Sequence, residues 1–198
     1  MLTRRTIIQS GAAAGLLAAF PMAASSAPPR VDLELLSRAR AALQRNRRHI
    51  RHADLFAMAD FTKPSRDKRF YLVDTESGSV TSYHVAHGRG SDPEHCGYVD
   101  RFSNHPGSAA SSAGAYVTGD FYQGKYGRSL RLKGLDDTNS NAAARGIVIH
   151  AAPYAEPEVV DRMGKLGRSE GCFALSQLSL YLVLARLGPG RMLYCDKL

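Results

Sequence analysis

The chain has 198 residues, which leave room for one domain with a modest core and exclude two full domains. With 22% charged residues its composition is that of an ordinary globular protein. A formal net charge of +8 does not identify a binding partner, because a basic surface attracts nucleic acid and anionic wall polymers alike. No segment after residue 27 is apolar enough to cross a membrane.

Residues 1–27 have the three parts of a bacterial export signal. Arg4 and Arg5 form a basic start, residues 11–20 are apolar but too short to span a bilayer, and small residues follow at 23–27. The arginine pair indicates the twin-arginine route. We expect this leader to be removed, which leaves a protein in the periplasm or cell envelope without a membrane span. A buried N-terminal helix is the alternative.

Residues 28–52 are predicted to form a linker and an N-terminal helix. Pro28 and Pro29 are typical of a linker, and Asp32 is placed to cap the helix that follows. Apolar residues then recur at helical spacing from Leu35 to Leu43, and arginines 38, 40, 45, 47 and 48 fill the other face. That face is predicted to be a solvated surface, with polyanion binding as the alternative.

Residues 53–198 are predicted to form the catalytic domain, with mainly β structure. Turn residues 76–78 separate two runs rich in Tyr, Val and Thr, which predicts a hairpin. The predicted strands are 69–74, 79–86, 114–120, 128–133, 146–150 and 191–195. Between them, residues 88–113 are rich in Gly, Ser, Pro and Asn and are expected to be a long functional loop.

A second helix is predicted near the C-terminus. Ser176 can cap it, and Gly188-Pro189 ends it. Its apolar face is expected to consist of Leu178, Tyr181, Leu182 and Ala185.

The chain has three cysteines, Cys96, Cys172 and Cys195. An oxidising compartment favours pairing, but an odd number leaves at least one thiol free or paired between chains. If Cys96 pairs with Cys195, Cys172 is the free one. Pairing cannot be deduced from sequence.

Two segments carry candidate chemistry: an apolar strand, Gly146 to His150, that ends in a histidine, and Gly167 to Cys172. A thiol is a strong nucleophile only as the thiolate, and a nearby imidazole can remove its proton. The N–H groups of Gly171 and Cys172 are predicted to form an oxyanion hole, since glycine lets a substrate approach the backbone. Arg168 adds positive charge that favours the thiolate.

Other interpretations of these residues exist. A lone cysteine is more often buried and inert, and a lone histidine at a strand end is more often structural. Residues 167–171 match the G-x-S-x-G elbow of serine hydrolases, but that fold needs its histidine after the serine, and His150 precedes Ser169. A zinc site is weakly supported, because its candidate ligands match no standard zinc spacing. These ligands are His84, His87, His95, Cys96 and His105.

From residue 60 to residue 175 the sequence resembles the murein L,D-transpeptidase catalytic family, the YkuD-like group, in its single-domain secreted branch. The resemblance rests on ordered motifs. They are Asp60-Phe61, Lys63-Pro64-Ser65, Val85-Ala86-His87-Gly88, Phe102-Ser103-Asn104, Gly107-Ser108, Ser111 to Tyr116, Tyr122-Gln123-Gly124, Gly127 to Leu130, Ile147 to His150 and Gly167 to Cys172. So many matches in order are more specific than any single motif.

The resemblance implies a mainly β, YkuD-like L,D-transpeptidase β-sandwich with a short N-terminal and a C-terminal helix. It implies Cys172 as the acylated nucleophile and His150 as the general base, with Ser169 and Gly171 beside them. Substrate contacts are expected from Arg168, Glu170, His87, Ser111 and Tyr116. The expected partners are peptidoglycan stem peptides. No cofactor, metal or nucleic acid is expected.

The implied reaction is 3→3 cross-linking of stem peptides through a thioester. An L,D-carboxypeptidase or hydrolase acting on the same stems is one alternative, since water can attack the same thioester. A non-catalytic wall-binding protein is another, and the intact His and Cys pair argues against it. Two features differ from better-known members: Glu170 replaces a histidine of Ser-His-Gly-Cys, and residues 173–175 lack an arginine. Substrate contacts there are expected to differ.

Overall fold

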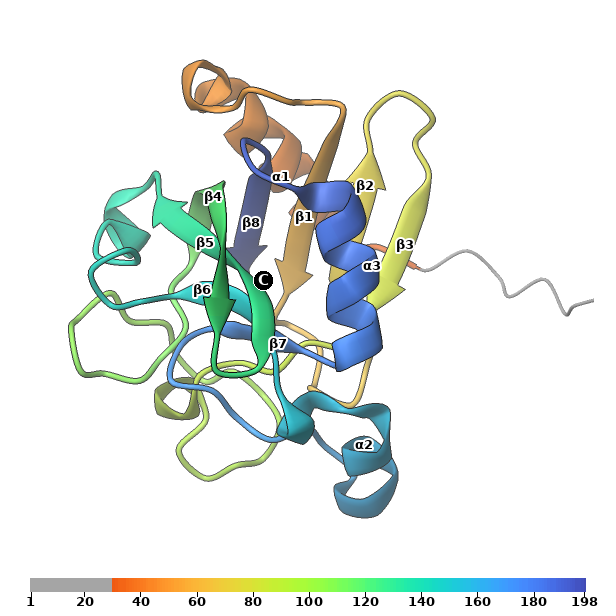
Figure 1. The fold of residues 1–198 in the computed structure, drawn as a ribbon, viewed down its shortest axis with the longest axis vertical. Helices are drawn as coiled ribbons and strands as arrows, with labels where there is room; N and C mark the ends of the chain where they lie inside the picture. Colours follow the sequence, from red (N-terminus) through yellow and green to blue (C-terminus); the bar gives the residue numbers. More distant parts are fainter. Residues whose placement is uncertain (1–29) are drawn as a thin grey trace, which may run out of the picture.

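The computed structural model describes residues 30–198 and shows one strongly curved, mixed β-sheet with helices on both faces (Figure 1). The strands are β1 (Leu55–Asp60), β2 (Phe70–Asp74), β3 (Val80–Tyr83), β4 (Gly114–Gly124), β5 (Gly127–Gly134), β6 (Val148–Ala151), β7 (Phe173–Leu175) and β8 (Met192–Asp196). The helices are α1 (Leu33–Arg45), α2 (Pro157–Met163) and α3 (Gln177–Leu187). The predicted export signal, residues 1–27, lies outside the described residues.

The strand order is β3-β2-β1-β8-β4-β5-β6-β7. The pairs β1–β8 and β6–β7 are parallel, and all the others are antiparallel. The predicted hairpin is confirmed as β2 and β3, joined at the expected turn. The curvature lets side chains from β1 and β2 share a core with side chains from β5, β6 and β7. The expected mainly β fold with a helix near each end is confirmed.

Strand β1 was missed by the sequence patterns, because Leu-Phe-Ala-Met-Ala neither alternates nor is rich in β-branched residues. All six of its residues are buried, since both faces of the sheet are covered there. Phe56 and Met58 pack beside α1, whereas Leu55, Ala57 and Ala59 face the core that contains α3. Strand β7 was missed for another reason: at three residues it is too short to show a period.

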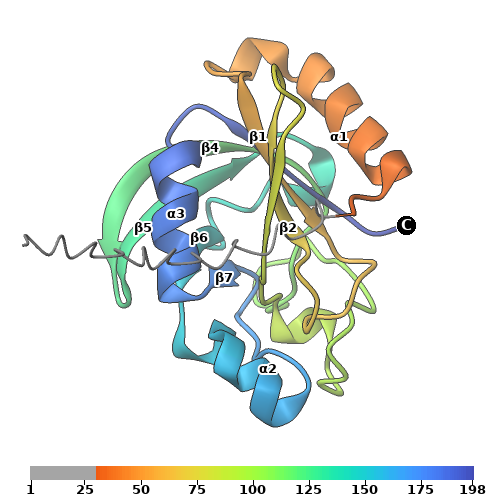
Figure 2. The same ribbon diagram turned by 90° about the vertical axis from the view of Figure 1, so that its right-hand side faces the viewer.

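Helix α1 and helix α3 lie on opposite sides of β1 and β2 (Figure 2). Asp32 caps α1 as predicted, accepting hydrogen bonds from the N–H groups of Glu34 and Leu35. Leu35 and Leu43 are buried against the sheet, so helix and strands share one core. The predicted cap of α3 is also confirmed, because the Ser176 hydroxyl accepts from the N–H of Ser179.

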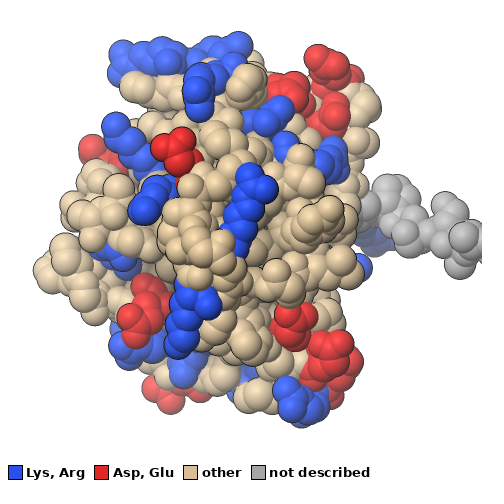
Figure 3. All heavy atoms as spheres, viewed as in Figure 1, with Lys and Arg blue, Asp and Glu red and all other residues tan. Residues whose placement is uncertain are grey.

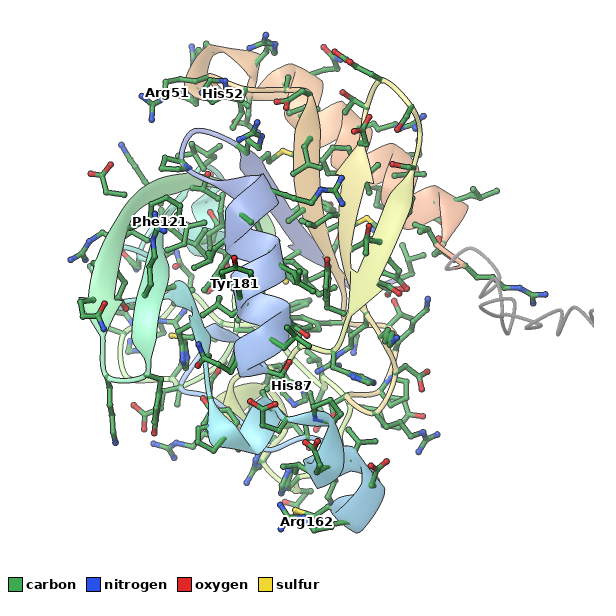
Figure 4. All side chains as sticks on the ribbon, turned by 45° about the vertical axis from the view of Figure 1, so that its right-hand side comes forward. Arg51, His52, His87, Phe121, Arg162 and Tyr181 are labelled. Atoms are coloured by element: carbon green, nitrogen blue, oxygen red, sulfur yellow. The ribbon has the colours of Figure 1, made fainter. Side chains whose placement is uncertain are left out.

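The predicted apolar face of α3 is wrong. The structure buries Leu180, Val183, Leu184 and Leu187. Leu178 and Tyr181 are 69% and 71% exposed, and Figure 4 shows Tyr181 on the outer side of the helix. Helix α3 is apolar almost all round, so two different sets of apolar residues at helical spacing could form its buried face. Packing against the curved sheet selects one of them.

The predicted solvated arginine face of α1 is exposed, as expected. Figure 3 shows Lys and Arg side chains gathered at the top of the view, over the end of α1 and the 3-10 turn η1 (Arg47–His49). The exposed arginines of this region are Arg40, Arg45, Arg47, Arg48 and Arg51.

No helix within residues 30–198 is long and apolar enough to cross a membrane. In the same residues no group of three or more His, Cys, Asp or Glu side chains is arranged to hold a metal ion. All three cysteines are free, so the bridge considered between Cys96 and Cys195 is absent. Cys195 is fully buried in β8, whereas Cys96 is exposed on the loop.

Candidate active site

Parallel pairing of β6 with β7 brings the two candidate catalytic residues together. His150 lies on β6 opposite Ala174 of β7, and Cys172 immediately precedes β7. Both side chains line a hollow of about 230 Å³ beside the tip of the β4–β5 hairpin. The Cys172 thiol points toward the carbonyl of Gly146, with Sγ 3.5 Å from that oxygen. Residues more than twenty positions apart in the sequence therefore form one site.

The imidazole of His150 is held in one orientation. Its Nδ1 lies 2.7 Å from the carbonyl oxygen of Ala151, and a carbonyl can only accept, so Nδ1 carries the proton. The ring of Tyr126 stacks on it, with centroids 6.2 Å apart and planes at 15°. Burial lowers the pKa of His150 below its ordinary value. The ring is thus neutral near pH 7, with Nε2 able to accept a proton.

The surroundings of Cys172 act in opposite directions on its ionisation. Burial raises the pKa of the thiol, and the nearby Glu170 carboxylate raises it further. A backbone hydrogen bond from Val148 and the positive charge of Arg145 lower this pKa. Burial is the largest of these effects, so the resting site holds a neutral thiol beside a neutral imidazole.

Cys172 lines two hollows. The first is the one that contains His150. The second has a volume of about 430 Å³ and is lined on its polar side by Arg89, Arg145 and Glu170. Cys172 and Gly146 belong to the walls of both. The two hollows therefore meet at Cys172.

Gly171 has a backbone conformation that requires glycine. Its φ is +118°, and a Cβ at this position would lie 2.7 Å from the carbonyl oxygen of Ala110. Its N–H donates to the Ser169 hydroxyl at 3.2 Å, and that hydroxyl donates to the carbonyl of Cys172 at 2.7 Å. The prediction that the Gly171 N–H forms an oxyanion hole is therefore corrected, because Ser169 already occupies it. Ser169 shapes the turn beside the nucleophile.

Two predicted substrate contacts are buried away from the hollows. Tyr116 is fully buried in the core, where its hydroxyl donates to the carbonyl of Ser112. His87 is 1% exposed and lies between Arg69 and Asp92, in the interior of the domain (Figure 4). Neither side chain can touch a bound peptide in this arrangement, and both predictions are corrected.

Of the remaining predicted contact residues, two hold neighbouring loops in place and one lines a hollow. Ser111 is fully buried; its hydroxyl accepts from the N–H of Gly88 and donates to the carbonyl of Gly171. Arg168 donates to the carbonyls of Asp92 and Pro93 and does not line either hollow. Both hold loops next to Cys172. The predicted contact of Ser111 with substrate is corrected because its side chain is buried, whereas that of the half-buried Arg168 stays a prediction. Glu170 alone among these five residues lines a hollow, with its side chain 78% exposed.

Arg145 is a site residue that the sequence patterns missed. It lies in the turn before β6, within an Asn-Ala-Ala-Ala-Arg-Gly stretch that carries no motif. The only signal available was its place five residues before His150. Tyr126 was missed in the same way, because a tyrosine at a hairpin tip carries no pattern of its own.

Solved structures with similar folds were found at low identity. An L,D-transpeptidase from Mycobacterium smegmatis is 14% identical, with 73% of this chain and 59% of that one covered and a TM-score of 0.45. L,D-transpeptidase 3 from Mycobacterium tuberculosis is 13% identical, with 72% and 61% covered and a TM-score of 0.47. The helical cell shape determining protein from Campylobacter jejuni is 14% identical, with 75% and 48% covered and a TM-score of 0.47.

The chain spans less than two thirds of the length of each of these three proteins. A comparison with curated proteins gave no significant match. The sequence profile of the L,D-transpeptidase catalytic domain matches residues 27–195. This match covers α1, all of the sheet except its last residue, and both walls of the site, and the chain therefore belongs to the L,D-transpeptidase catalytic domain family.

Proposed function

We propose that the protein is an exported L,D-transpeptidase that cross-links peptidoglycan stem peptides through a thioester on Cys172. One observation carries this proposal: Cys172 lines two hollows, and the neutral imidazole of His150 lines one of them. Transfer of an acyl group from one peptide to another needs a nucleophile that two substrates can reach, and a base beside it.

In the first half of the reaction, His150 accepts the thiol proton through Nε2 as Cys172 attacks the carbonyl of the third stem residue. The C–N bond to the terminal D-alanine breaks, and the imidazolium returns the proton to the departing amine. The products are a thioester on the sulfur and free D-alanine.

In the second half, the side-chain amine of another stem attacks the thioester carbonyl. His150 takes a proton from this amine, the C–S bond breaks, and the thiol is restored with that proton. The product is a 3→3 cross-link. Since His150 handles the proton of both amines, the leaving and the incoming amine share its hollow. The larger hollow, with Arg89 and Glu170, is then left for the body of the acylating stem.

The proposed location follows from the leader and the substrate. Residues 1–27 have the pattern of a twin-arginine export signal, and the proposed substrate belongs to the cell wall. We place the protein in the periplasm or cell envelope. Fusion of residues 1–27 to a reporter that matures only after export tests this, and Arg4→Lys with Arg5→Lys is expected to abolish the signal.

The reaction is tested by incubating purified tetrapeptide stems with the protein and analysing the products by mass spectrometry. A cross-linked dimer that has lost one D-alanine supports the proposal. Tripeptide alone identifies an L,D-carboxypeptidase, in which water has replaced the acceptor amine. Unchanged tetrapeptide, from a preparation whose Cys172 reacts with thiol reagents, contradicts both activities.

A further inference from the structure

Arg145 has an unusually complete set of hydrogen bonds for a residue that lines a cavity. Its Nη1 donates to the carbonyl of Ser103 at 2.6 Å and to the hydroxyl of Ser112 at 2.7 Å. Its Nη2 donates to the hydroxyl of Ser108 at 3.1 Å and to the carbonyl of Ala110. A guanidinium has four terminal N–H bonds, and all four are used here.

These bonds join two parts of the site. Arg145 precedes β6, the strand that carries His150, and its four partners lie in the loop of residues 103–112. No other side chain of residues 30–198 makes four hydrogen bonds to this loop. Arg145 therefore ties the loop to the strand of the candidate base, alongside the bonds that Asn104 of the loop makes to residues 137–141.

The same loop contacts the nucleophile segment on its other side. The carbonyl of Ala110, which accepts from Arg145, lies where a Cβ on Gly171 would clash. The hydroxyl of Ser111 donates to the carbonyl of Gly171 at 3.3 Å. A chain of contacts thus runs from Arg145 through residues 110 and 111 to Gly171, the neighbour of Cys172.

Arg145 differs in kind from the other arginine of the larger hollow. Arg89 is 61% exposed and makes one side-chain contact, with Glu170 at 3.3 Å. Such a guanidinium is free to turn toward a substrate. Arg145 is half-buried and cannot donate a terminal N–H to a ligand without losing an existing bond. It can still act through its charge, which lies beside the thiol.

We infer that Arg145 is a positioning residue: it holds the 103–112 loop against Gly171 and, as a fixed positive charge, favours the thiolate of Cys172. This inference rests on the proposed role of Cys172, but it concerns the reactivity of the thiol and not the identity of the peptide.

Several other charged or titratable groups face the same thiol. They are His150, Tyr122, Lys125 and Tyr126 in the smaller hollow, Arg89 and Glu170 in the larger one, and Tyr154, whose pKa is raised by burial and by the negative charge of an ionised Cys172. Glu170 opposes Arg145, since its carboxylate disfavours the thiolate. Comparison of Arg145 variants in an otherwise constant site removes these contributions.

The test measures alkylation of Cys172 by iodoacetamide as a function of pH, in a Cys96→Ser background. This background is needed because Cys96 is exposed, whereas Cys195 is fully buried. Cys172→Ala in the same background gives the blank. The rate of acylation by a β-lactam of the carbapenem type is measured on the same proteins, with the folded fraction taken from circular dichroism.

Arg145→Gln removes the positive charge and most of the N–H donors of the planar guanidinium. The alkylation midpoint is expected to move to higher pH, and the acylation rate per folded molecule to fall about 10- to 100-fold, as for a displaced reacting group. Arg145→Lys keeps the charge but cannot reproduce the planar fork. Its midpoint is expected to stay near that of the parent while its acylation rate falls. The matched control is Arg186→Gln on α3, which is expected to change neither value.

A folded Arg145→Gln variant with the parent midpoint and the parent rate overturns the inference. A Lys variant whose midpoint matches that of the Gln variant overturns the part concerning charge. If Arg145→Gln does not fold, Ser108→Ala removes one loop bond and keeps the charge; a parent-like acylation rate in this variant overturns the part concerning the loop. Alkylation needs no stem peptide, so an Arg145-dependent midpoint without peptide turnover leaves the inference standing and contradicts only the proposed reaction.

Discussion

The two histidines at the ends of extended segments have opposite surroundings. His150 ends an apolar strand, lines a hollow and has only its Nδ1 occupied by a protein group. His87 also follows an extended segment and precedes a glycine, but both of its nitrogens have partners within a buried network. One ring can exchange protons with a substrate and the other cannot. Similar local sequence thus gives a candidate base in one place and a packing residue in the other.

The protonation state of His87 follows from its partners. Arg69 can only donate, and its Nη2 lies 2.6 Å from Nδ1, so Nδ1 accepts and Nε2 carries the proton. Nε2–H then donates to the Asp92 carboxylate at 3.2 Å. Burial and the Arg69 charge lower the pKa of His87 to about 3. The network also supports the site, because the His87 carbonyl accepts from the N–H of Ser169 at 2.8 Å.

The largest effect is expected from replacing Cys172, the proposed nucleophile, which lies beside His150 and not beside His87. Cys172→Ala is expected to fold normally and to lose all acylation, since no other group is placed to hold the acyl intermediate. Intact-mass analysis after treatment with a carbapenem should show one adduct on the parent and none on the variant. An adduct that persists in the variant points to another nucleophile, such as Ser169.

Replacement of the proposed base is the next largest effect. His150→Gln keeps a hydrogen-bonding side chain but cannot accept the thiol proton, and loss of a general base costs about 10²–10⁴ in rate. Part of this loss should be recovered at high pH, where hydroxide ionises the thiol directly. Acylation rates measured against pH for both proteins test this. Superimposable curves remove His150 from the mechanism.

Replacement of the buried His87 should lower the stability of the protein and leave its acylation rate nearly unchanged. His87→Ala removes one buried partner each from Arg69 and Asp92, which keep their bonds to backbone groups, and is expected to lower the free energy of unfolding by about 1–3 kcal/mol. Its acylation rate per folded molecule should change little compared with that of His150→Gln. Urea denaturation, together with rates corrected for the folded fraction, separates the two roles. A stable His87→Ala protein with a greatly reduced rate reverses the comparison.

Acid should destabilise the protein through the same residue. The folded-state pKa of His87, about 3, lies below its ordinary value of 6.5, so the stabilisation is complete above pH 6.5 and is lost as the pH falls toward 3. His87→Gln removes this titration and should show a flatter dependence of unfolding free energy on pH. Equal slopes for the two proteins between pH 6.5 and 4 contradict the assignment.

The smallest effect concerns the ring that stacks on the base. Tyr126→Leu keeps apolar bulk but removes the aromatic face that contacts His150. Aromatic pairs contribute about 0.5–1.5 kcal/mol beyond their buried area, so the acylation rate should fall only a few-fold. Tyr181→Leu, on the exposed face of α3, is the matched control. A loss as large as that of His150→Gln gives Tyr126 a direct role in the chemistry.

Much of the fold could be predicted from local patterns. The β2–β3 hairpin has two runs rich in Tyr, Val and Thr around a turn, and the caps at Asp32 and Ser176 carry side chains that accept hydrogen bonds from the first helical N–H groups. The patterns failed where burial is complete or the element is short. Strand β1 is covered on both faces and shows no alternation, and α3 is apolar on two sides.

The sequence by itself determined the family, the candidate nucleophile and the candidate base, because Cys172 and His150 lie within ordered motifs that local reading can recognise. Only the tertiary structure decided which neighbours face the sulfur. His87, Tyr116 and Arg168 belong to similar motifs, yet burial and hydrogen bonding turn them away from both hollows. Arg145 belongs to no motif and lies beside the thiol, because a loop more than thirty residues earlier folds back to accept its hydrogen bonds. Exposure and charge at a site depend on contacts between distant segments, which no local pattern contains.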